Sequence, residues 1–424
     1  MADMTCLAEG LVVPADFEKT GRNLNEIVVG PTGCGKSFSN AYSRMLHTTD
    51  SSVVIQFTKP EIRDGFTNYY KDQGYDVINL DLVDPGNCRT GYDPLDFVHS
   101  DMDVIHLARR LVGSVPSSSR TGSIDPYWND SATSVLAAEI GLVRLNAEDN
   151  GKTASFADVI KLHRSLVVDS KLKVISTNLD CWFERAAKKH PGNQASELWK
   201  TVQGLAVSTA SCIISIVNNA VDKLFSDDVI GILSQKKRIS FKDMGKQKTA
   251  LFIFTSSMNK TLQNLINLIY SDMLKELFEA AQSNSRGKLD VPVHIICDDF
   301  ACGSKIMDFE EYISVFRAAG ISVTLLLQSE SQLESMYGEN EATTIINNCD
   351  TYVYMGGMDI KTCKNISQRL DKPLKKVLSM PLEQVVVFRR GEEPFVSRRY
   401  QILNDPLYQV LMAKKSDEDD NTYR

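Results

Sequence analysis

The sequence has no long apolar run. None of its apolar stretches approaches the ~18–20 residues that span a bilayer, and its first residues lack the basic end and long apolar stretch of a signal peptide. We therefore expect a cytoplasmic protein without a transmembrane segment. The nine cysteines never form Cys-x-x-Cys, and the six histidines form no His-Glu-x-x-His motif. These absences disfavour a disulfide framework and a zinc site, and they favour free thiols in a reducing compartment.

The composition is that of a globular chain. Of 424 residues, 43% are apolar and 24% are charged, which excludes a disordered protein and a disulfide-stapled miniprotein. This length predicts about two or three domains, or one large core with an insertion. The formal net charge of −7 excludes a polycation that coats nucleic acid. Any contact with DNA or RNA must therefore use a local basic surface.

Short apolar runs rich in Val, Ile and Phe alternate with helix-length segments. Several runs are apolar at nearly every position, as strands covered on both faces are. The alternation predicts an α/β fold with a mostly parallel, twisted sheet. The expected strands are Ile27–Val29, Val53–Phe57, Val77–Leu80, Ala250–Thr255, Val293–Cys297, Ser322–Leu327, Thr351–Tyr354 and Gln384–Phe388.

One stretch, residues 125–236, breaks this alternation. It contains all three tryptophans and several helical patterns, such as Ala206–Phe225, but no convincing strand. We expect an all-α domain here, inserted between the third and fourth strands of a discontinuous α/β core. That core comprises residues 1–124 and 237–413, and residues 414–424 form a polar tail.

A glycine-rich segment follows the first expected strand. It fits the pattern G-x-x-x-x-G-K-[ST] at every position, and a helix is expected after it over Ser37–Leu46. The glycines let backbone N–H groups point at phosphate oxygens, and the helix N-terminus adds its partial positive charge. Lys36 can reach the β- and γ-phosphates of ATP, and Ser37 can ligate Mg²⁺. The predicted nucleotide-binding residues are Gly30, Pro31, Thr32, Gly33, Cys34, Gly35, Lys36 and Ser37.

Four further residues are candidates for nucleotide chemistry. Asp298 and Asp299 end an apolar run, which places them at the carboxyl edge where open α/β sheets bind ligands. We predict that Asp298 holds Mg²⁺ with Ser37, and that Asp299 is the general base for the attacking water. Gln328 ends the next run and could sense the γ-phosphate through that water. Arg317 precedes that run, and in a ring of subunits it could stabilise the transition state at a neighbour's nucleotide. The alternative for the acidic pair is a strand followed by an Asp-rich turn, and for Gln328 and Arg317 it is a solvated or structural role.

An ordered set of short elements follows the acidic pair. They are Asp298-Asp299-Phe300-Ala301, Arg317, Gly320-Ile321-Ser322, Gln328-Ser329, Gln332-Leu333, Tyr337-Gly338, Asn348-Cys349 and Gly356-Gly357. Two more lie upstream, Asp93-Pro94-Leu95 and Asp125-Pro126-Tyr127-Trp128. Over residues 24–400 the chain resembles the ATPase core of the type IV secretion coupling proteins, the TraG/TraD-like conjugative DNA-transfer ATPases. The resemblance implies a RecA-like P-loop NTPase core.

The resemblance also implies a function. It describes a hexameric ATPase that drives single-stranded DNA, or a relaxase–DNA substrate, to the channel of a conjugation system. ATP and Mg²⁺ are the implied cofactors; relaxosome proteins and secretion-channel components are the implied partners. The implied place is the inner face of the cell membrane, reached through the secretion apparatus. An isolated chain could be a monomer, because Arg317 would then have no neighbouring site to complete.

Two departures from the family pattern leave alternatives open. Family members usually begin with membrane-spanning helices, which this sequence lacks. They also usually carry Glu where this chain has Asp299, and the shorter side chain could slow hydrolysis. One alternative is a nucleotide-controlled docking platform that recruits relaxase or effector proteins with little hydrolysis. A generic RecA-like helicase is another, whereas an ABC-type ATPase is disfavoured because no LSGGQ-like signature is present.

The interval 372–399 carries seven basic residues against three acidic ones in an otherwise acidic chain. A ring could line its channel with this interval and bind DNA phosphates without reading sequence. The alternative, which we favour, is a solvated hairpin edge guarded by Lys and Arg.

Overall fold

The computed structural model describes residues 3–113, 126–169, 174–256, 260–302 and 305–412. Contacts divide the chain into two compact units. The sheet unit comprises Met1–Leu80, Ser240–Ser257 and Met273–Arg424, and the helical unit comprises Asp81–Ile239 and Met258–Asp272. The boundary predicted at residues 124 and 125 and the tail predicted at 414–424 lie outside the described residues. The limits of the predicted inserted domain therefore stay a prediction.

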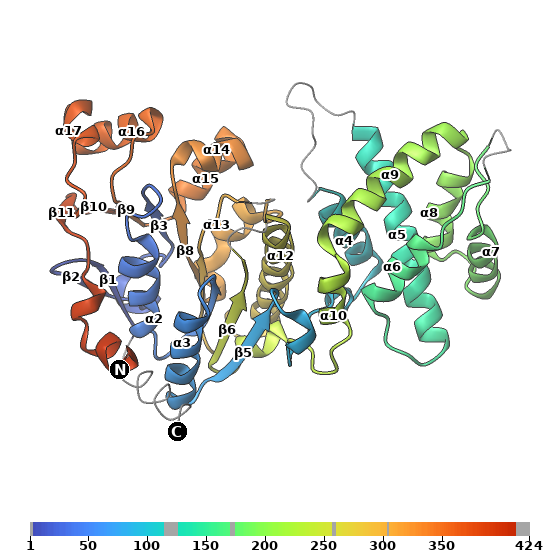
Figure 1. Ribbon diagram of the computed structural model, residues 1–424, viewed down its shortest axis with the longest axis horizontal. Helices are drawn as coiled ribbons and strands as arrows, with labels where there is room; N and C mark the ends of the chain where they lie inside the picture. Colours follow the sequence, from blue (N-terminus) through green and yellow to red (C-terminus); the bar gives the residue numbers. More distant parts are fainter. Residues whose placement is uncertain (1–2, 114–125, 170–173, 257–259, 303–304, 413–424) are drawn as a thin grey trace. The chain divides into compact units, whose positions relative to one another are not determined.

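One large sheet organises the sheet unit (Figure 1). Its strand order among the described residues is β11-β10-β9-β3-β8-β7-β4-β6-β5. The strands from β9 to β6 pair in parallel, whereas β10 pairs antiparallel with both β9 and β11. The strands are β3 (Glu26–Val29), β4 (Ser52–Phe57), β5 (Asp76–Asp81), β6 (Thr249–Phe254), β7 (Val293–Cys297), β8 (Ile321–Leu327), β9 (Thr351–Tyr354), β10 (Gln384–Arg389) and β11 (Phe395–Arg398). A separate antiparallel hairpin pairs β1 (Met4–Ala8) with β2 (Leu11–Pro14).

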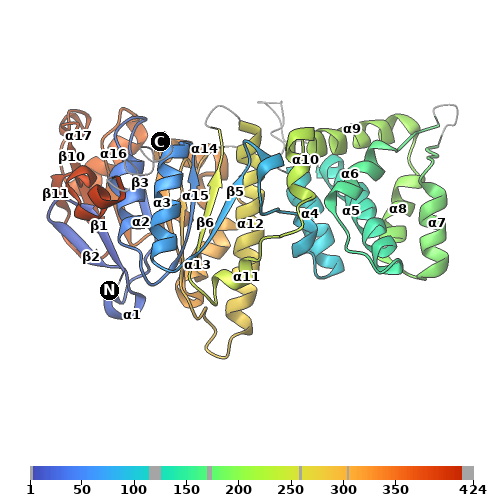
Figure 2. The same ribbon diagram turned by 60° about the horizontal axis from the view of Figure 1, so that its bottom comes forward.

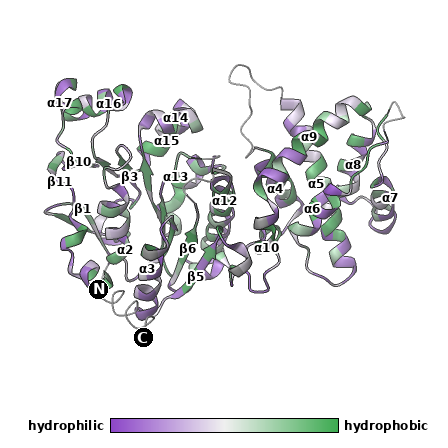
Figure 3. Ribbon diagram, in the orientation of Figure 1, coloured by the Kyte–Doolittle hydropathy of each residue, from purple (hydrophilic) through white to green (hydrophobic). Residues whose placement is uncertain are grey.

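The central strands are covered on both faces. Every residue of β3, β4, β6, β7 and β8 is buried, and Figure 3 shows hydrophobic residues along these strands. This burial explains the near-continuous apolar runs in the sequence. All eight expected strands are confirmed, as is the α/β class with a mostly parallel sheet. The sequence missed β1, β2 and β11, which are short and of which β2 and β11 are partly exposed.

The helix after the glycine-rich loop has an unusual start. Its first six residues, Ser37–Tyr42, form a π-helix (η1), which continues into α2 (Ser43–Leu46). π-helical turns are rare and frequently occur at functional sites. Tyr42 and Met45 pack into the core beside Phe57 and Phe66. The expected helix is therefore confirmed, but its π-helical turn was not predicted.

The other helices of the sheet unit pack around this sheet (Figure 1). They are α1 (Phe17–Thr20), α3 (Pro60–Asp72), α11 (Phe241–Met244), α13 (Phe309–Ala319), α14 (Glu330–Tyr337), α15 (Glu339–Asn347), α16 (Ile360–Leu370), α17 (Leu374–Leu378) and the 3₁₀ turn η4 (Ile402–Asn404). Helix α12 (Lys260–Ser283) contributes residues to both units.

The helical unit is organised around α5 (Pro126–Asp149), which packs against α4, α6, α8 and α9 (Figure 2). The expected helix at 206–225 is confirmed as α9. The other elements are η2 (Pro85–Asn87), η3 (Pro94–Phe97), α4 (Asp101–Gly113), α6 (Phe156–Arg164), α7 (Asp180–Lys189), α8 (Gln194–Gln203), α9 (Val207–Leu224) and α10 (Asp227–Leu233). Across the described part of the chain, no helix is both long enough and apolar enough to cross a membrane.

Candidate active site

The candidate site lies at the carboxyl ends of three neighbouring strands. Strands β3, β8 and β7 are parallel neighbours, with Val29 beside Leu327 and Leu325 beside Cys297. Their carboxyl ends therefore meet at one edge of the sheet. The glycine-rich loop leaves β3 at this edge, Asp298 leaves β7 and Gln328 leaves β8. The structure thus brings together segments that lie far apart in the sequence.

The glycine-rich loop needs its glycines for two different reasons. Gly33 and Gly35 have φ angles of 80° and 90°, in the left-handed region that favours glycine. Gly30 is needed for close approach, because an added Cβ would lie 2.7 Å from Sγ of Cys34 and 2.9 Å from Cβ of Met355. The start of the loop therefore packs closely against Met355, the residue directly after β9, and its conformation depends on these glycines.

The side chain of Lys36 folds back over the loop. Its Nζ donates hydrogen bonds to the carbonyl oxygens of Gly30 at 2.7 Å and Pro31 at 3.1 Å. Only 8% of the residue is exposed. No described carboxylate forms an ion pair with this ammonium group, so its charge is available to a phosphate within the loop. This geometry suits the predicted contact with the β- and γ-phosphates.

Ser37 and Asp298 form a pair of oxygen donors. The Ser37 hydroxyl donates a 2.7 Å hydrogen bond to Oδ2 of Asp298. Burial raises the pKa of the Asp298 carboxyl, and the negative charge of Asp299 raises it further, while the Ser37 hydrogen bond and Lys36 lower it. Hydroxyl and carboxylate oxygens are the ligands that Mg²⁺ prefers, and Mg²⁺ sites commonly combine one or two protein oxygens with phosphates and waters. The pair therefore fits the predicted metal.

Asp299 lies beside this pair but faces solvent. Its φ of 52° is left-handed, a conformation that Asp tolerates better than most residues. Its backbone N–H donates to Oδ1 of Asp298 at 3.1 Å, and its carbonyl accepts from the N–H of Cys302 at 3.0 Å. The backbone is thereby fixed while the exposed side chain stays open to water. Its role as general base stays a prediction.

Gln328 is exposed at the end of β8, one residue after Leu327, whose carbonyl accepts a 3.1 Å hydrogen bond from Gly30 N–H. Gln332 supports this position, a role that was not predicted from the sequence. Its Oε1 accepts from the backbone N–H of Gln328 at 3.3 Å, and its Nε2 donates to the carbonyl of Ala301 at 3.2 Å. Gln332 thus ties the segment after β8 to the segment after β7.

Arg317 lies at the opposite edge of the sheet. It occupies the last turn of α13, which leads into the amino end of β8. The seven residues of β8 separate it from Gln328, and at ~3.3 Å per residue this strand is about 23 Å long. Its side chain is exposed and forms no ion pair with a described carboxylate. Within one chain, therefore, Arg317 does not join the other candidate residues.

Arg399 contacts the loop, although the sequence placed it only in the basic interval 372–399. Its Nη1 donates a 2.8 Å hydrogen bond to the carbonyl oxygen of Cys34. No local pattern marks this residue, since the contact spans 365 positions of sequence. Two other arginines of that interval form ion pairs, Arg389 with Glu392 and Arg390 with Asp350.

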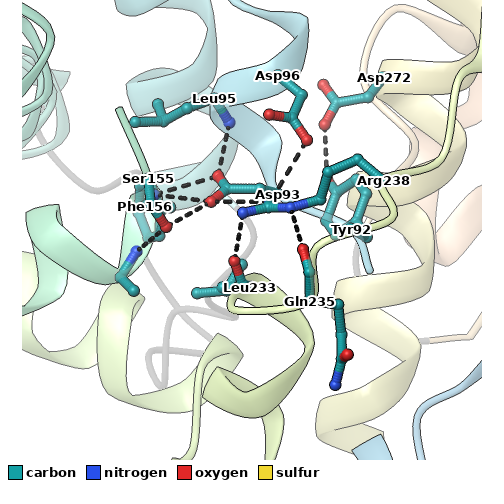
Figure 4. A network of polar contacts seen from close by, with 11 residues as sticks. Tyr92, Asp93, Leu95, Asp96, Ser155, Phe156, Leu233, Gln235, Arg238 and Asp272 are labelled. Carbon is teal, nitrogen blue, oxygen red and sulfur yellow. Dashed lines mark hydrogen bonds and ion pairs between the residues drawn. The ribbon is translucent and has the colours of Figure 1, made fainter. Parts of the chain in front are cut away.

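The element Asp93-Pro94-Leu95 builds structure in the helical unit (Figure 4). The buried Asp93 carboxylate accepts hydrogen bonds from the Ser155 hydroxyl at 2.7 Å and from the backbone N–H of Leu95 at 3.0 Å. It also pairs with Arg238 at 3.2 Å. Arg238 reaches Asp96 at 3.4 Å as well. Asp93 thus links η3 to the start of α6 and to the segment that contains Arg238.

Comparison with known proteins identifies one family. The profile of the family described as "Type IV secretory system Conjugative DNA transfer" matches residues 10–373. No curated protein sequence gives a significant match.

Several solved structures share the fold. The bacterial conjugative coupling protein TrwBdeltaN70, in a trigonal form with sulphate, is 19% identical; the match covers 89% of this chain and 85% of that one, with a TM-score of 0.62. The plasmid coupling protein TrwB with a non-hydrolysable ATP analogue, ADPNP, is 18% identical over 95% of this chain and 89% of that one, with a TM-score of 0.66. VirB4 of Thermoanaerobacter pseudethanolicus is 12% identical over 96% and 98%, with a TM-score of 0.56.

Proposed function

Because the chain belongs to the family of type IV secretory system conjugative DNA transfer proteins, we propose that it is a coupling ATPase that moves single-stranded DNA, or a relaxase–DNA substrate, to the secretion channel. The match confirms the family predicted from the sequence. The observation that carries the proposed activity is the joint placement of Lys36, Ser37 and Asp298 at one sheet edge. The solved TrwB complexes with ADPNP and with ADP and Mg²⁺ support ATP and Mg²⁺ as the cofactors.

The proposed mechanism assigns one task to each side chain. The loop N–H groups and Lys36 bind the phosphates, and Ser37 and Asp298 would hold Mg²⁺, which would supply positive charge to the transferred phosphoryl group. Asp299 accepts a proton from the attacking water, and Gln328 orients that water. Because the protein itself forms no covalent bond to the phosphoryl group in this mechanism, catalysis depends on positioning and on electrostatic stabilisation.

The position of Arg317 supports assembly into a ring. It lies about 23 Å from the nucleotide edge of its own sheet and is exposed, so it can complete a site only in a neighbouring subunit. We propose a homo-hexamer in which Arg317 stabilises the transition state at the adjacent nucleotide. An isolated monomer would then hydrolyse ATP slowly.

The partners and the location follow from the proposed function. The ring would receive relaxosome proteins, meet components of the secretion channel and lie at the inner face of the membrane through that apparatus. The exposed side chain of Asp299, one methylene shorter than Glu, supports one second candidate: a nucleotide-controlled docking platform with little hydrolysis. The two candidates differ in whether DNA stimulates turnover.

The test is ATP hydrolysis with and without single-stranded DNA. We expect DNA to raise the rate of the wild-type protein, and we expect Lys36→Ala to abolish both ATP binding and turnover. Asn tolerates the left-handed backbone of residue 299, so Asp299→Asn should fold and bind ATP while its kcat falls by at least about 100-fold. Tight ATP binding without DNA-dependent turnover at any protein concentration would favour the docking platform instead.

A further inference from the structure

The segment after β11 reaches the glycine-rich loop because of the sheet topology. Strand β9 is parallel to β3, β10 is antiparallel to β9, and β11 is antiparallel to β10. Strand β11 therefore runs in the same direction as β3. Both strands end at the same edge of the sheet, so residue 399 emerges at the edge that carries the loop.

The backbone around Arg399 is fixed from two sides. On one side, Arg398 is the last residue paired with β10, opposite Gln384, and the N–H of Arg399 donates to the carbonyl of Glu383 at 2.8 Å. On the other side, the turn between β1 and β2 holds the strand, because the N–H of Glu9 donates to the carbonyl of Arg398 at 2.9 Å. The backbone from which the Arg399 side chain extends is thus held in place by the fold itself.

The guanidinium group of Arg399 covers the second half of the loop. Besides the 2.8 Å hydrogen bond to the Cys34 carbonyl, its Nη1 lies 3.2 Å from the position that a Cβ on Gly35 would occupy. Gly35 has a φ of 90°, so the backbone that follows the Cys34 carbonyl holds a left-handed conformation that few residues other than glycine adopt. A donor on the carbonyl of Cys34 stabilises this conformation and helps to aim the following N–H groups into the loop.

The charge of Arg399 is not neutralised within the chain. Arg389 and Arg390 each pair with a carboxylate, whereas Arg399 forms no ion pair with any carboxylate in the described parts of the chain. A full positive charge therefore lies within hydrogen-bond distance of a phosphate-binding backbone. Charge-assisted hydrogen bonds and nearby positive charge favour a bound phosphate anion.

From this geometry we propose that Arg399 is a positioning residue for the bound nucleotide, supplied by the same chain. It holds the Cys34–Gly35 peptide in its binding conformation and adds positive charge beside the nucleotide's phosphates. Arg399 therefore acts at the nucleotide and not on DNA, in contrast to the DNA-contact interpretation of the interval 372–399. The inference rests on the proposed function, because it requires that the loop bind a nucleotide.

The test compares ADP binding, in the presence of Mg²⁺, by isothermal titration calorimetry. Arg399→Gln should weaken ADP binding by about tenfold or more, as expected for the loss of a charge-assisted contact. Arg399→Lys keeps the charge without the planar fork, so its loss should be about two- to threefold. Arg398→Gln is the matched control: it removes one positive charge from the adjacent, exposed residue and should change the affinity by less than about twofold.

Melting in the absence of nucleotide separates a positioning role from a purely structural one. We expect the Arg399 variants to melt within about 2 °C of the wild type without ADP, and to gain less stability from ADP. If Arg399→Gln binds ADP as tightly as the wild type while Lys36→Ala does not bind, the inference is wrong and the proposed function stands. The inference also fails if Arg399→Lys is as defective as Arg399→Gln and both melt well below the wild type. If the wild type itself binds no ADP, both proposals fail.

Discussion

The hydroxyl of Ser37 donates a 2.7 Å hydrogen bond to the carboxylate of Asp298, although 261 positions separate the two residues in sequence. The strand order places β8 between β3 and β7, and all three strands end at the same edge. The contact thus connects the two halves of a predicted metal site. In the nucleotide complex Ser37 and Asp298 would hold Mg²⁺, and their mutual hydrogen bond would be given up.

Replacing Ser37 with Ala should therefore affect binding only where Mg²⁺ takes part. We expect ADP binding in Mg²⁺ to weaken by about tenfold, while binding in EDTA stays within about twofold of the wild type, because a metal ligand is lost and the loop is retained. Calorimetric titration under both conditions measures the difference. Equal losses with and without Mg²⁺ would show that Ser37 is needed for the loop and not for the metal.

The thiol of Cys34 offers a chemical probe of the loop. It is partly buried against the core, and its Sγ lies only 2.7 Å from the position of a Cβ on Gly30, so a bulky adduct would crowd the loop. We expect a maleimide at Cys34 to weaken nucleotide binding by at least about tenfold, and we expect ATP to slow the labelling. The exposed thiols of Cys181 and Cys212 should be replaced with Ser beforehand.

The control for this experiment is Cys34→Ser in the same background. Its nucleotide affinity should not respond to the reagent. Full labelling of Cys34 with unchanged ATP affinity would contradict the placement of the loop at the nucleotide.

The network of Asp93, Asp96 and Arg238 predicts a pH dependence of folding. Burial, opposed by Arg238 and reinforced by Asp93, raises the pKa of Asp96 from its ordinary value near 3.8 to about 6. The folded state therefore holds this proton more tightly than the unfolded state does. The corresponding stability is present below pH 4 and is lost as the pH rises through 6. Allowing for solvent screening, we expect a loss on the order of 1 kcal/mol.

Urea unfolding between pH 4 and 7 measures this effect. In the Asp96→Asn variant, the free energy of unfolding should no longer fall as the pH rises through 6, whether or not the variant is less stable overall. Asp130→Asn replaces an exposed carboxylate of the same unit and should keep the wild-type pH profile. If Asp96→Asn also keeps that profile, titration of Asp96 is not the cause of the pH dependence of stability.

The sequence predicted the parts of the fold that burial determines. Central strands such as β6 and β7 are apolar at all but one position because both faces of the sheet are covered. It missed β11 because three of its four residues are exposed, so a strand at the edge of the sheet leaves no apolar signal. The π-helical turn at Ser37–Tyr42 could not be predicted from residue types that also suit an α-helix.

The candidate site shows the same division. Motif spacing and strand ends predicted Ser37 and Asp298 as residues that hold one Mg²⁺, and the structure places their side chains 2.7 Å apart. The contact of Arg399 with Cys34 depends on the direction of three edge strands, and no spacing rule gives it. Gln332 was noted only as part of the family pattern, because its two hydrogen bonds join segments whose approach depends on the sheet.

The most direct test of a shared active site is to mix two inactive variants. Lys36→Ala removes nucleotide binding from its own subunit but still offers Arg317 to a neighbour, whereas Arg317→Ala does the reverse. In a ring of randomly mixed subunits at equal amounts, about a quarter of the interfaces join an intact Lys36 to an intact Arg317. The account predicts that the mixture recovers DNA-stimulated ATP hydrolysis at about that fraction of the wild-type rate. A mixture that stays as inactive as its two components, or an Arg317→Ala variant that is fully active alone, would contradict it.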